Sequence, residues 1–285
     1  MHKVFLNGDF VDADKASISP MDRGFLFGDG IYEVIPTYST KPVGLGLHLA
    51  RMNEGLKAVG IEYQADEAQW RKVIGDLVKQ TDSDSQAVYI HISRGADKKR
   101  FHAYPKGIQP TVFAYAFDIA PSQDLQSKHT KTYHVTLAED LRWQRCHIKS
   151  TSLLGNVMHF QQGQEAGKDE VILYNQQNEV TEAAACNVFI VKDGRIATPP
   201  LDNHLLPGIT RRIAIDAIHK YTSLPVDERV VSLDELNEAD EVWITSSSKE
   251  LGPVLSIDDK KVGNGEPGKI WREAQEAYNK HKFNC

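Results

Sequence analysis

The chain has 285 residues, of which 41% are hydrophobic and 25% are charged, and its formal net charge is −6 at pH 7. These proportions are those of an ordinary globular protein, and the length is sufficient for two domains that each have a core. The acidic balance argues against a nucleic-acid partner, because such a partner requires a concentration of basic residues.

The composition also argues against membrane, metal and disulfide classes. No segment approaches the ~18 consecutive apolar residues of a transmembrane helix, and the beginning, MHKVFLNGDFVDADK, lacks the apolar core of a signal peptide. The three cysteines, Cys146, Cys186 and Cys285, are odd in number and widely separated, which fits neither a disulfide framework nor a zinc site. We therefore expect a cytoplasmic protein that binds neither a membrane nor a metal ion.

The first half of the chain contains strand and helix patterns in alternation. Residues 3–12 alternate around an Asn-Gly-Asp sequence, which is typical of a two-residue hairpin turn. Further strands are expected at 31–38, 87–93 and 111–117, and helices at 46–59 and 67–80. Residues 119–128 are polar and contain Pro121, so we interpret them as an interdomain linker that ends a small domain at residues 1–118.

The second half, residues 129–285, is expected to form a larger domain. A strand is predicted at 131–138, hairpins at 169–184 and 187–199, a strand at 241–245, and helices from about 209 and from about 267. Hairpins mixed with helices, without a strict alternation of parallel strands and helices, favour the α+β class for both domains.

Lys149 precedes a predicted helix start. Ser150, Thr151 and Ser152 can each cap a helix, and the apolar residues that follow, Leu153, Leu154, Val157 and Phe160, share one helical face. A lysine held at the positive end of a helix in apolar surroundings is disfavoured in its charged form, which favours Schiff-base chemistry near neutral pH. Because roughly nine lysines in ten are solvated surface charges, this spacing alone does not identify a reactive residue.

The segment DLRWQRCHIKSTSLLGNV, residues 140–157, resembles the lysine segment of the class IV, or fold type IV, pyridoxal-phosphate aminotransferases. Within that group it is most similar to the D-amino-acid (D-alanine) aminotransferases. The likeness runs from FLNGDFV near residue 5 to TSSSKELGPV near residue 254. The resemblance implies a two-domain α+β fold with pyridoxal 5'-phosphate at the domain interface and the cofactor lysine, Lys149, in the larger domain.

The same resemblance assigns further residues to the cofactor. Glu182 would face the pyridine nitrogen, where a carboxylate within hydrogen-bond reach keeps that nitrogen protonated. Alone, a glutamate after a strand is usually solvated, and the local sequence at 206–211 indicates only a loop entering a helix. By resemblance, the phosphate is bound by Arg51, by the amides of Ile209 and Thr210, and by the hydroxyls of Ser246 and Ser247, while Leu206 packs against the cofactor ring.

An Arg-x-His pair, Arg100 and His102, indicates the class of substrate. Taken alone, residues 93–105 look like a basic surface loop. In the D-amino-acid aminotransferases such a pair lies on a loop of the neighbouring subunit and joins a tyrosine, matched here by Tyr32, in holding the substrate α-carboxylate. The resemblance therefore implies a homodimer that transfers amino groups from D-amino acids such as D-alanine and D-glutamate to 2-oxo acids such as 2-oxoglutarate.

The sequence departs from the family pattern in two places. Ala183, Ala184, Ala185 and Cys186 replace a glycine and serines, which predicts fewer hydrogen bonds near the cofactor, each of ~1 kcal/mol. His147 replaces an acidic residue two positions before the lysine. The alternatives are an aminodeoxychorismate lyase or a branched-chain L-amino-acid aminotransferase, which the Arg-x-His pair disfavours, and a non-catalytic protein that binds pyridoxal phosphate.

Overall fold

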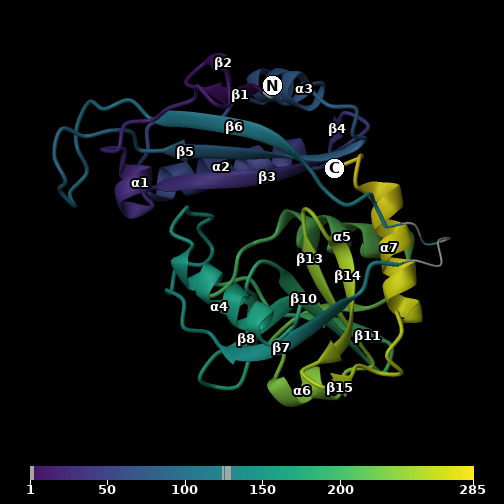
Figure 1. The fold of residues 1–285 in the computed structure, drawn as a ribbon. Coiled ribbons are helices and arrows are strands. Elements are labelled where there is room, and N and C mark those ends of the chain that lie inside the picture. Colours follow the sequence, from purple (N-terminus) through teal and green to yellow (C-terminus); the bar gives the residue numbers. More distant parts are fainter. Residues whose placement is uncertain (1–2, 124, 126–129) are drawn as a thin grey trace. The chain divides into compact units, whose positions relative to one another are not determined.

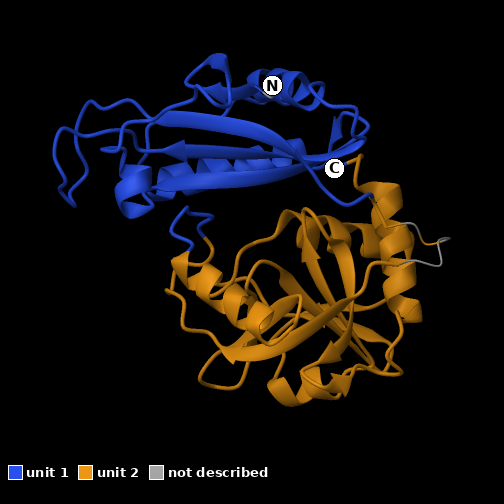
Figure 2. Ribbon diagram, viewed as in Figure 1, with its two compact units in different colours: residues 1–121, 148–153, 285 blue, residues 122–147, 154–284 orange. Residues whose placement is uncertain are grey.

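The computed structural model describes residues 3–123, 125 and 130–285, which form two compact units (Figures 1 and 2). Unit 1 contains residues 1–121, 148–153 and 285, and unit 2 contains residues 122–147 and 154–284. The division after Pro121 falls within the segment expected to be a linker, of which residues 124 and 126–128 lie outside the described residues. Each unit combines a sheet with helices, which confirms the α+β class.

Unit 1 is built on a six-stranded antiparallel sheet with the order β2-β1-β6-β5-β3-β4. Its strands are β1 (Lys3–Leu6), β2 (Asp9–Asp12), β3 (Gly30–Tyr38), β4 (Lys41–Pro42), β5 (Ser85–Ser93) and β6 (Thr111–Asp118). Asn7 and Gly8 both have positive φ, 52° and 105°, as the two-residue turn of the β1–β2 hairpin requires. The hairpin and the strands expected in this half of the chain are thereby confirmed.

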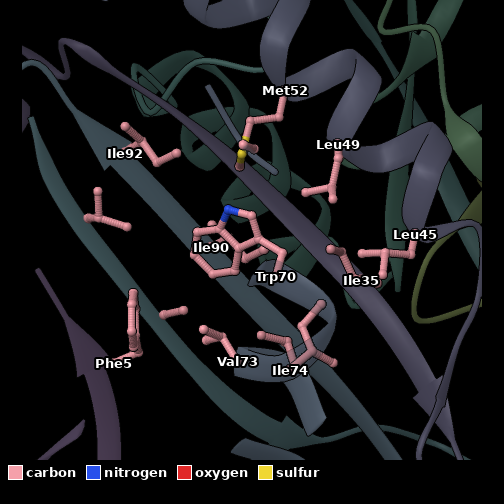
Figure 3. Close-up of a cluster of buried hydrophobic side chains, with 14 of the residues drawn as sticks. Phe5, Ile35, Leu45, Leu49, Met52, Trp70, Val73, Ile74, Ile90 and Ile92 are labelled. Atoms are coloured by element: carbon pink, nitrogen blue, oxygen red, sulfur yellow. The ribbon is translucent and has the colours of Figure 1, made fainter. Parts of the chain in front are cut away.

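The helices of unit 1 are α1 (Arg23–Phe27), α2 (Leu45–Ala58) and α3 (Glu67–Val78). The Asp66 side chain accepts a hydrogen bond from the Gln69 amide and so caps α3. Apolar side chains of α2, α3 and the sheet, among them Met52, Trp70 and Ile35, form one buried cluster (Figure 3). This core fixes β3 against α2, and β3 and α2 supply several of the polar residues discussed below.

The segment 148–153 packs with unit 1, whereas the sequence led us to expect Lys149 in the larger second domain. The Tyr32 amide donates to the Lys149 carbonyl at 3.0 Å, and the Thr151 amide donates to the Gly30 carbonyl at 2.9 Å. The Thr151 and Ser152 hydroxyls donate to the Gly28 carbonyl oxygen, at 2.9 and 3.0 Å. These hydroxyls therefore bind the backbone before β3 and do not cap a helix.

Unit 2 contains a mixed nine-stranded sheet with the order β12-β11-β10-β13-β14-β7-β8-β9, to which β15 adds beside β14. The strands are β7 (Tyr133–Glu139), β8 (Glu170–Tyr174), β9 (Val180–Ala183), β10 (Asn187–Lys192), β11 (Arg195–Thr198), β12 (Val226–Glu228), β13 (Glu241–Ser246), β14 (Glu250–Ile257) and β15 (Lys260–Lys261). The antiparallel pairs β8–β9 and β10–β11 are the two expected hairpins. Strand β7 is parallel to both of its neighbours, β8 and β14.

The helices of unit 2 are α4 (Leu154–Glu165), α5 (Ile209–Tyr221), α6 (Leu233–Asn237) and α7 (Lys269–His281). Two of the apolar residues that the sequence placed on one helical face, Leu154 and Val157, are 73% and 58% exposed. Helix α4 instead buries His159 and Gly163, and Phe160 packs against the small cluster around Val171. Every helix within the described part of the chain is too short or too polar to cross a membrane.

Candidate active site

Lys149 lies beside an aromatic side chain of β3. Its Nζ atom is 4.1 Å from the centroid of the Tyr32 ring, a distance at which the ring face attracts an ammonium group. Both residues are fixed by the hydrogen bond between the Tyr32 amide and the Lys149 carbonyl. Unit 1 therefore brings together the expected cofactor lysine and the expected substrate tyrosine.

A buried charged cluster occupies the opposite side of β3. Glu33 accepts hydrogen bonds from Arg51 Nε and Nη2, both at 2.7 Å, and its Oε2 atom lies 2.7 Å from His48 Nδ1. Burial would raise the pKa of Glu33, but Arg51 and His48 hold it at about 2. Burial lowers the pKa of His48 despite the carboxylate, and the charges of Arg51 and Lys149 lower it further. Arg51, expected at the phosphate, is thus oriented by a permanently ionised partner.

Glu182 lies on β9 in unit 2 and is almost fully buried. Its Oε1 atom accepts from Arg142 Nη1 at 2.5 Å, and its Oε2 atom accepts from the Leu206 amide at 3.1 Å. Burial raises the pKa of Glu182 to about 7, although Arg142 and the Leu206 amide favour the ionised form. The carboxyl group is therefore held in one orientation and changes its charge near neutral pH.

Arg142 is a functional candidate that the sequence did not reveal. Its Nε and Nη2 atoms donate to the two carboxylate oxygens of Asp140 at 2.9 and 2.7 Å, and Nη2 also donates to the His204 carbonyl. Burial would lower the pKa of Arg142, but Asp140 and Glu182 raise it, so the guanidinium stays charged. The only signal in the sequence was its position seven residues before Lys149 within the resembling segment.

Asn187 connects Glu182 to the beginning of α5. Its Nδ2 atom donates to the Leu206 carbonyl at 2.8 Å and to Glu182 Oε2 at 3.3 Å, and its backbone pairs with Thr245 of β13. Gly208 packs so closely that a Cβ atom there would overlap Asn187 Oδ1. Asn187 therefore places Leu206 and the first residues of α5 beside the end of β13.

The donors in this part of unit 2 suit an anion. Helix α5 begins at Ile209 without a side-chain cap at Gly208, so its first amides are available at the positive end of the helix. Among the described residues, the buried hydroxyl oxygen of Thr245 has no hydrogen-bond partner, and Ser246 is the next residue along β13. Ser247 follows in the turn between β13 and β14 and is half-buried. The expected phosphate residues of unit 2 are thus neighbours in the fold.

Arg100 and His102 share a neighbour in unit 1. The Arg100 guanidinium carbon lies 5.0 Å from the centroid of the Phe27 ring, and the His102 ring centroid lies 5.4 Å from it. Both side chains are exposed. The fold therefore places the guanidinium group of Arg100 and the imidazole ring of His102 next to one aromatic ring.

Comparison with known proteins decides the family. The family described as amino-transferase class IV matches residues 30–257. A D-alanine aminotransferase of Staphylococcus haemolyticus is 36% identical over 99% of this chain and 98% of its own length, and one of Bacillus licheniformis is 36% identical over 96% and 95%. The chain is a class IV aminotransferase.

Solved structures of other aminotransferases share the fold of this aminotransferase. The branched-chain amino acid aminotransferase of Escherichia coli has a TM-score of 0.88 at 24% identity and matches 98% of this chain and 94% of its own. A branched-chain aminotransferase of Thermoproteus uzoniensis, solved with norvaline, has a TM-score of 0.85 at 23% identity and matches 98% and 94%. At these identities the likeness concerns the fold alone.

The residues expected at the cofactor and at the substrate of this class IV aminotransferase are found in both units. Unit 1 holds Lys149, Arg51, Tyr32, Arg100 and His102, and unit 2 holds Glu182, Leu206, Ile209, Thr210, Ser246 and Ser247. Their chemistry fits pyridoxal phosphate: an amine for its aldehyde, a buried carboxyl group for its ring nitrogen, and helix amides with hydroxyl groups for its phosphate.

Cys186, which follows the three alanines 183–185 of this aminotransferase, belongs to a second buried polar cluster in unit 2. Cys186 Sγ lies 3.5 Å from Glu170 Oε2, and Lys249 Nζ lies 3.7 Å from the same oxygen. Burial raises the pKa of Cys186 to about 12, even though the charge of Lys249 opposes this. Cys186 is therefore a packed thiol. His147, the other departure from the family pattern, is exposed.

Proposed function

We propose that this class IV aminotransferase transfers amino groups between D-amino acids, such as D-alanine and D-glutamate, and 2-oxo acids, such as 2-oxoglutarate. The observation that carries the proposal is the placement of Arg100 and His102 against the same Phe27 ring. Relatives that are 36% identical over nearly the whole chain and are named D-alanine aminotransferases support it. The branched-chain enzymes resemble this chain at only 23–24% identity, which supports a shared fold.

Pyridoxal phosphate, when bound, supplies an aldehyde carbon and a ring that accepts electrons from the substrate. Lys149 Nζ would hold that carbon, and its free amine would move the proton from the substrate Cα to the aldehyde carbon within one half-reaction. Glu182 binds the ring nitrogen and keeps a proton there. Ile209, Thr210, Ser246, Ser247 and Arg51 bind the phosphate, and Leu206 contacts the ring.

Tyr32, Arg100 and His102 form the proposed carboxylate-binding group. With the α-carboxylate held by this group, the Cα–H bond of a D-amino acid points toward Lys149, whereas that of the L-isomer points away. Stereochemistry therefore follows from the placement of one anionic group relative to one amine. The α-carboxylate is common to all the substrates, so this group sets handedness and leaves side-chain preference to other residues.

A substrate panel tests this function. Purified enzyme with pyridoxal phosphate is incubated with single D- or L-amino acids and 2-oxoglutarate, and release of the new 2-oxo acid is measured. D-alanine should react faster than any L-amino acid. Faster turnover of L-leucine would favour a branched-chain enzyme, and release of pyruvate from aminodeoxychorismate would favour the lyase. Absence of any reaction with bound cofactor would indicate a non-catalytic binding protein.

We further propose that the enzyme acts as a homodimer in which the 93–105 loop reaches the neighbouring active site. Phe101 and Tyr104 of this loop are 55% and 60% exposed in the single chain. Leu154, Val157 and Met158 give α4 an apolar exposed face, which is unusual for a surface that remains in water. The free thiols of Cys146 and Cys186 are consistent with a cytoplasmic location, which we also propose.

Mixed dimers test this arrangement. Lys149→Ala and Arg100→Ala proteins should each be inactive or weak alone. After subunit exchange, a mixed dimer contains one site with both Lys149 and Arg100 intact, so activity should partly return. If exchange is verified by native mass spectrometry and activity does not return, the carboxylate-binding group belongs to a single subunit.

A further inference from the structure

The loop that carries Arg100 and His102 is fixed through its backbone by one buried arginine of α1. Arg23 Nη1 donates to the Phe101 carbonyl at 2.5 Å and to the Ala103 carbonyl at 3.5 Å, and Nη2 donates to the His102 carbonyl at 3.1 Å. The Arg23 side chain is only 4% exposed. One guanidinium group therefore binds three consecutive carbonyl groups of an otherwise exposed loop.

Arg23 is itself oriented by an ionised carboxylate. Its Nε atom donates to Asp29 Oδ2 at 2.7 Å, and Asp29 also accepts from Arg94 Nε and Nη2 at 2.8 and 2.9 Å. Burial would raise the pKa of Asp29, but the hydrogen bonds from Arg94 and Arg23 lower it, so the group stays charged. The planar guanidinium can thus present its remaining donors in one direction only.

Helix α1 also supplies the surface on which the loop side chains rest. Phe27, four residues after Arg23, is the ring that Arg100 and His102 both contact, and the Arg23 guanidinium carbon lies 4.8 Å from the centroid of that ring. The end of the loop is bound separately, because Arg94 lies 3.6 Å from the centroid of the Tyr104 ring. Arg23 is therefore the contact that acts on the residues between Arg100 and Tyr104.

We propose that Arg23 is a positioning residue for substrate binding, which holds the backbone of residues 101–103 so that Arg100 and His102 face the substrate carboxylate. It acts through these two residues and does not touch the substrate. This inference rests on the proposed function, since it assigns Arg100 and His102 to the carboxylate. It adds a specificity determinant in α1 that no sequence pattern indicated, because Arg23 and the loop are separated by about 80 residues.

The test uses Arg23→Met, which keeps the length of the side chain and removes its donors. In the holoenzyme, tryptic cleavage after Lys98, Lys99 and Arg100 should become at least about 10-fold faster, because charge-assisted contacts of the loop are lost. The KM for D-alanine should rise about 10-fold or more, while kcat changes by less than about 2-fold. The cleavage rate and the KM of an Arg23→Lys variant should lie between those of the parent enzyme and those of Arg23→Met. Arg23→Lys is used in place of Arg23→Met if the methionine variant does not fold.

The matched control is Arg71→Met, which breaks an exposed ion pair with Glu67 on α3. It should change neither the rate of tryptic cleavage nor the KM for D-alanine. In an Arg100→Ala/His102→Ala background, Arg23→Met should alter KM by less than about 2-fold, because the residues it positions are absent. A KM effect that persists in that background, or faster cleavage with unchanged KM, would overturn the proposal. Unchanged cleavage would overturn it as well.

The two arms of this test separate this inference from the proposed function. Cleavage of the loop measures its order and does not depend on which reaction the enzyme catalyses. If the parent enzyme turned over no D-amino acid but Arg23→Met still loosened the loop, the proposed function would be at fault. If D-amino acids reacted normally and Arg23→Met left the loop and KM unchanged, the role of Arg23 would be at fault.

Discussion

Arg142 donates a 2.5 Å hydrogen bond to Glu182, and both side chains are nearly excluded from solvent, at 3% and 6% exposure. Arg142 is held on its other side by Asp140, so the guanidinium cannot turn away from Glu182. The carboxyl group that we assign to the cofactor ring is consequently oriented by the protein before any ligand binds. Such preorganisation lowers the cost of binding.

Replacing Arg142 by methionine should destabilise the protein. The change leaves Asp140 and Glu182 buried without their counter-charge, which typically costs about 3 kcal/mol or more in the free energy of unfolding. Urea denaturation of the cofactor-free protein at pH 7 measures this difference. Arg195→Met is the matched control, because its ion pair with Asp227 is exposed and should contribute less than about 1 kcal/mol. Equal effects of the two substitutions would disprove the role of Arg142.

The pKa of Glu182 predicts a pH dependence of stability. Because burial raises this pKa from 4.5 to about 7, the folded protein retains a proton that the unfolded chain releases above pH 4.5. The contribution of Glu182 is therefore fully present below pH 4.5 and is lost as the pH rises to about 7. A Glu182→Gln variant has no carboxyl group to ionise and so keeps its stability as the pH rises. Its free energy of unfolding relative to the parent protein should therefore increase between pH 4.5 and about 7, by up to about 3 kcal/mol. Parallel pH profiles of the two cofactor-free proteins would contradict the prediction.

Glu33 should show the opposite behaviour. Arg51 and His48 lower its pKa from 4.5 to about 2 against the effect of burial, so its contribution is present above pH 4.5 and is lost as the pH falls to about 2. Glu33→Gln should cost about 3–5 kcal/mol at pH 7, because Arg51 loses its buried partner. The difference from the parent protein should shrink as the pH is lowered from 4.5, and a constant difference would show that Glu33 is not ionised in the folded protein.

Gly208→Ala should weaken cofactor binding through Asn187. The added Cβ overlaps Asn187 Oδ1 and displaces the first turn of α5, which we assign to the phosphate. We expect the affinity for pyridoxal phosphate to fall about 10-fold, and the affinity for pyridoxal, which lacks the phosphate, to change less. The two dissociation constants are measured by fluorescence titration.

Gly75→Ala is the control for this experiment. A Cβ at Gly75 in α3 meets no atom within 4 Å, so this substitution should leave both affinities unchanged. It should also stabilise α3 slightly, by roughly 0.5–1 kcal/mol, because alanine loses less backbone entropy in a helix. If Gly208→Ala lowered the affinities for the two ligands equally, the start of α5 would not be the phosphate site.

Local patterns predicted most of the secondary structure, because its signals lie within a few residues of one another. The Asn7-Gly8 turn and the alternation on either side are sufficient to specify the β1–β2 hairpin. The segment around Lys149 was harder to predict. Ser150, Thr151 and Ser152 favour a helix cap locally, but the hydroxyls of Thr151 and Ser152 donate to the Gly28 carbonyl. Helix α4 therefore begins only at Leu154.

The family resemblance predicted the residues of the candidate site that belong to the family motifs. It did not reveal the residues that orient them. Arg142, Asn187 and Arg23 act through partners that are distant in the sequence, so no spacing pattern reveals them. The exposure of Leu154 and Val157 is likewise not visible in the sequence. Periodicity identifies an apolar face of a helix, but it does not indicate whether the same chain covers that face.

Lys149 should transfer the proton of a D-amino acid in a half-reaction that needs no second substrate. Holoenzyme is mixed with D-alanine in the absence of any 2-oxo acid, and pyruvate is measured after a single turnover. The proposed mechanism predicts about one pyruvate per active site with D-alanine, as expected of ping-pong kinetics, and almost none with L-alanine or with the Lys149→Ala protein. Equal pyruvate from L-alanine, or undiminished pyruvate from Lys149→Ala, would contradict it.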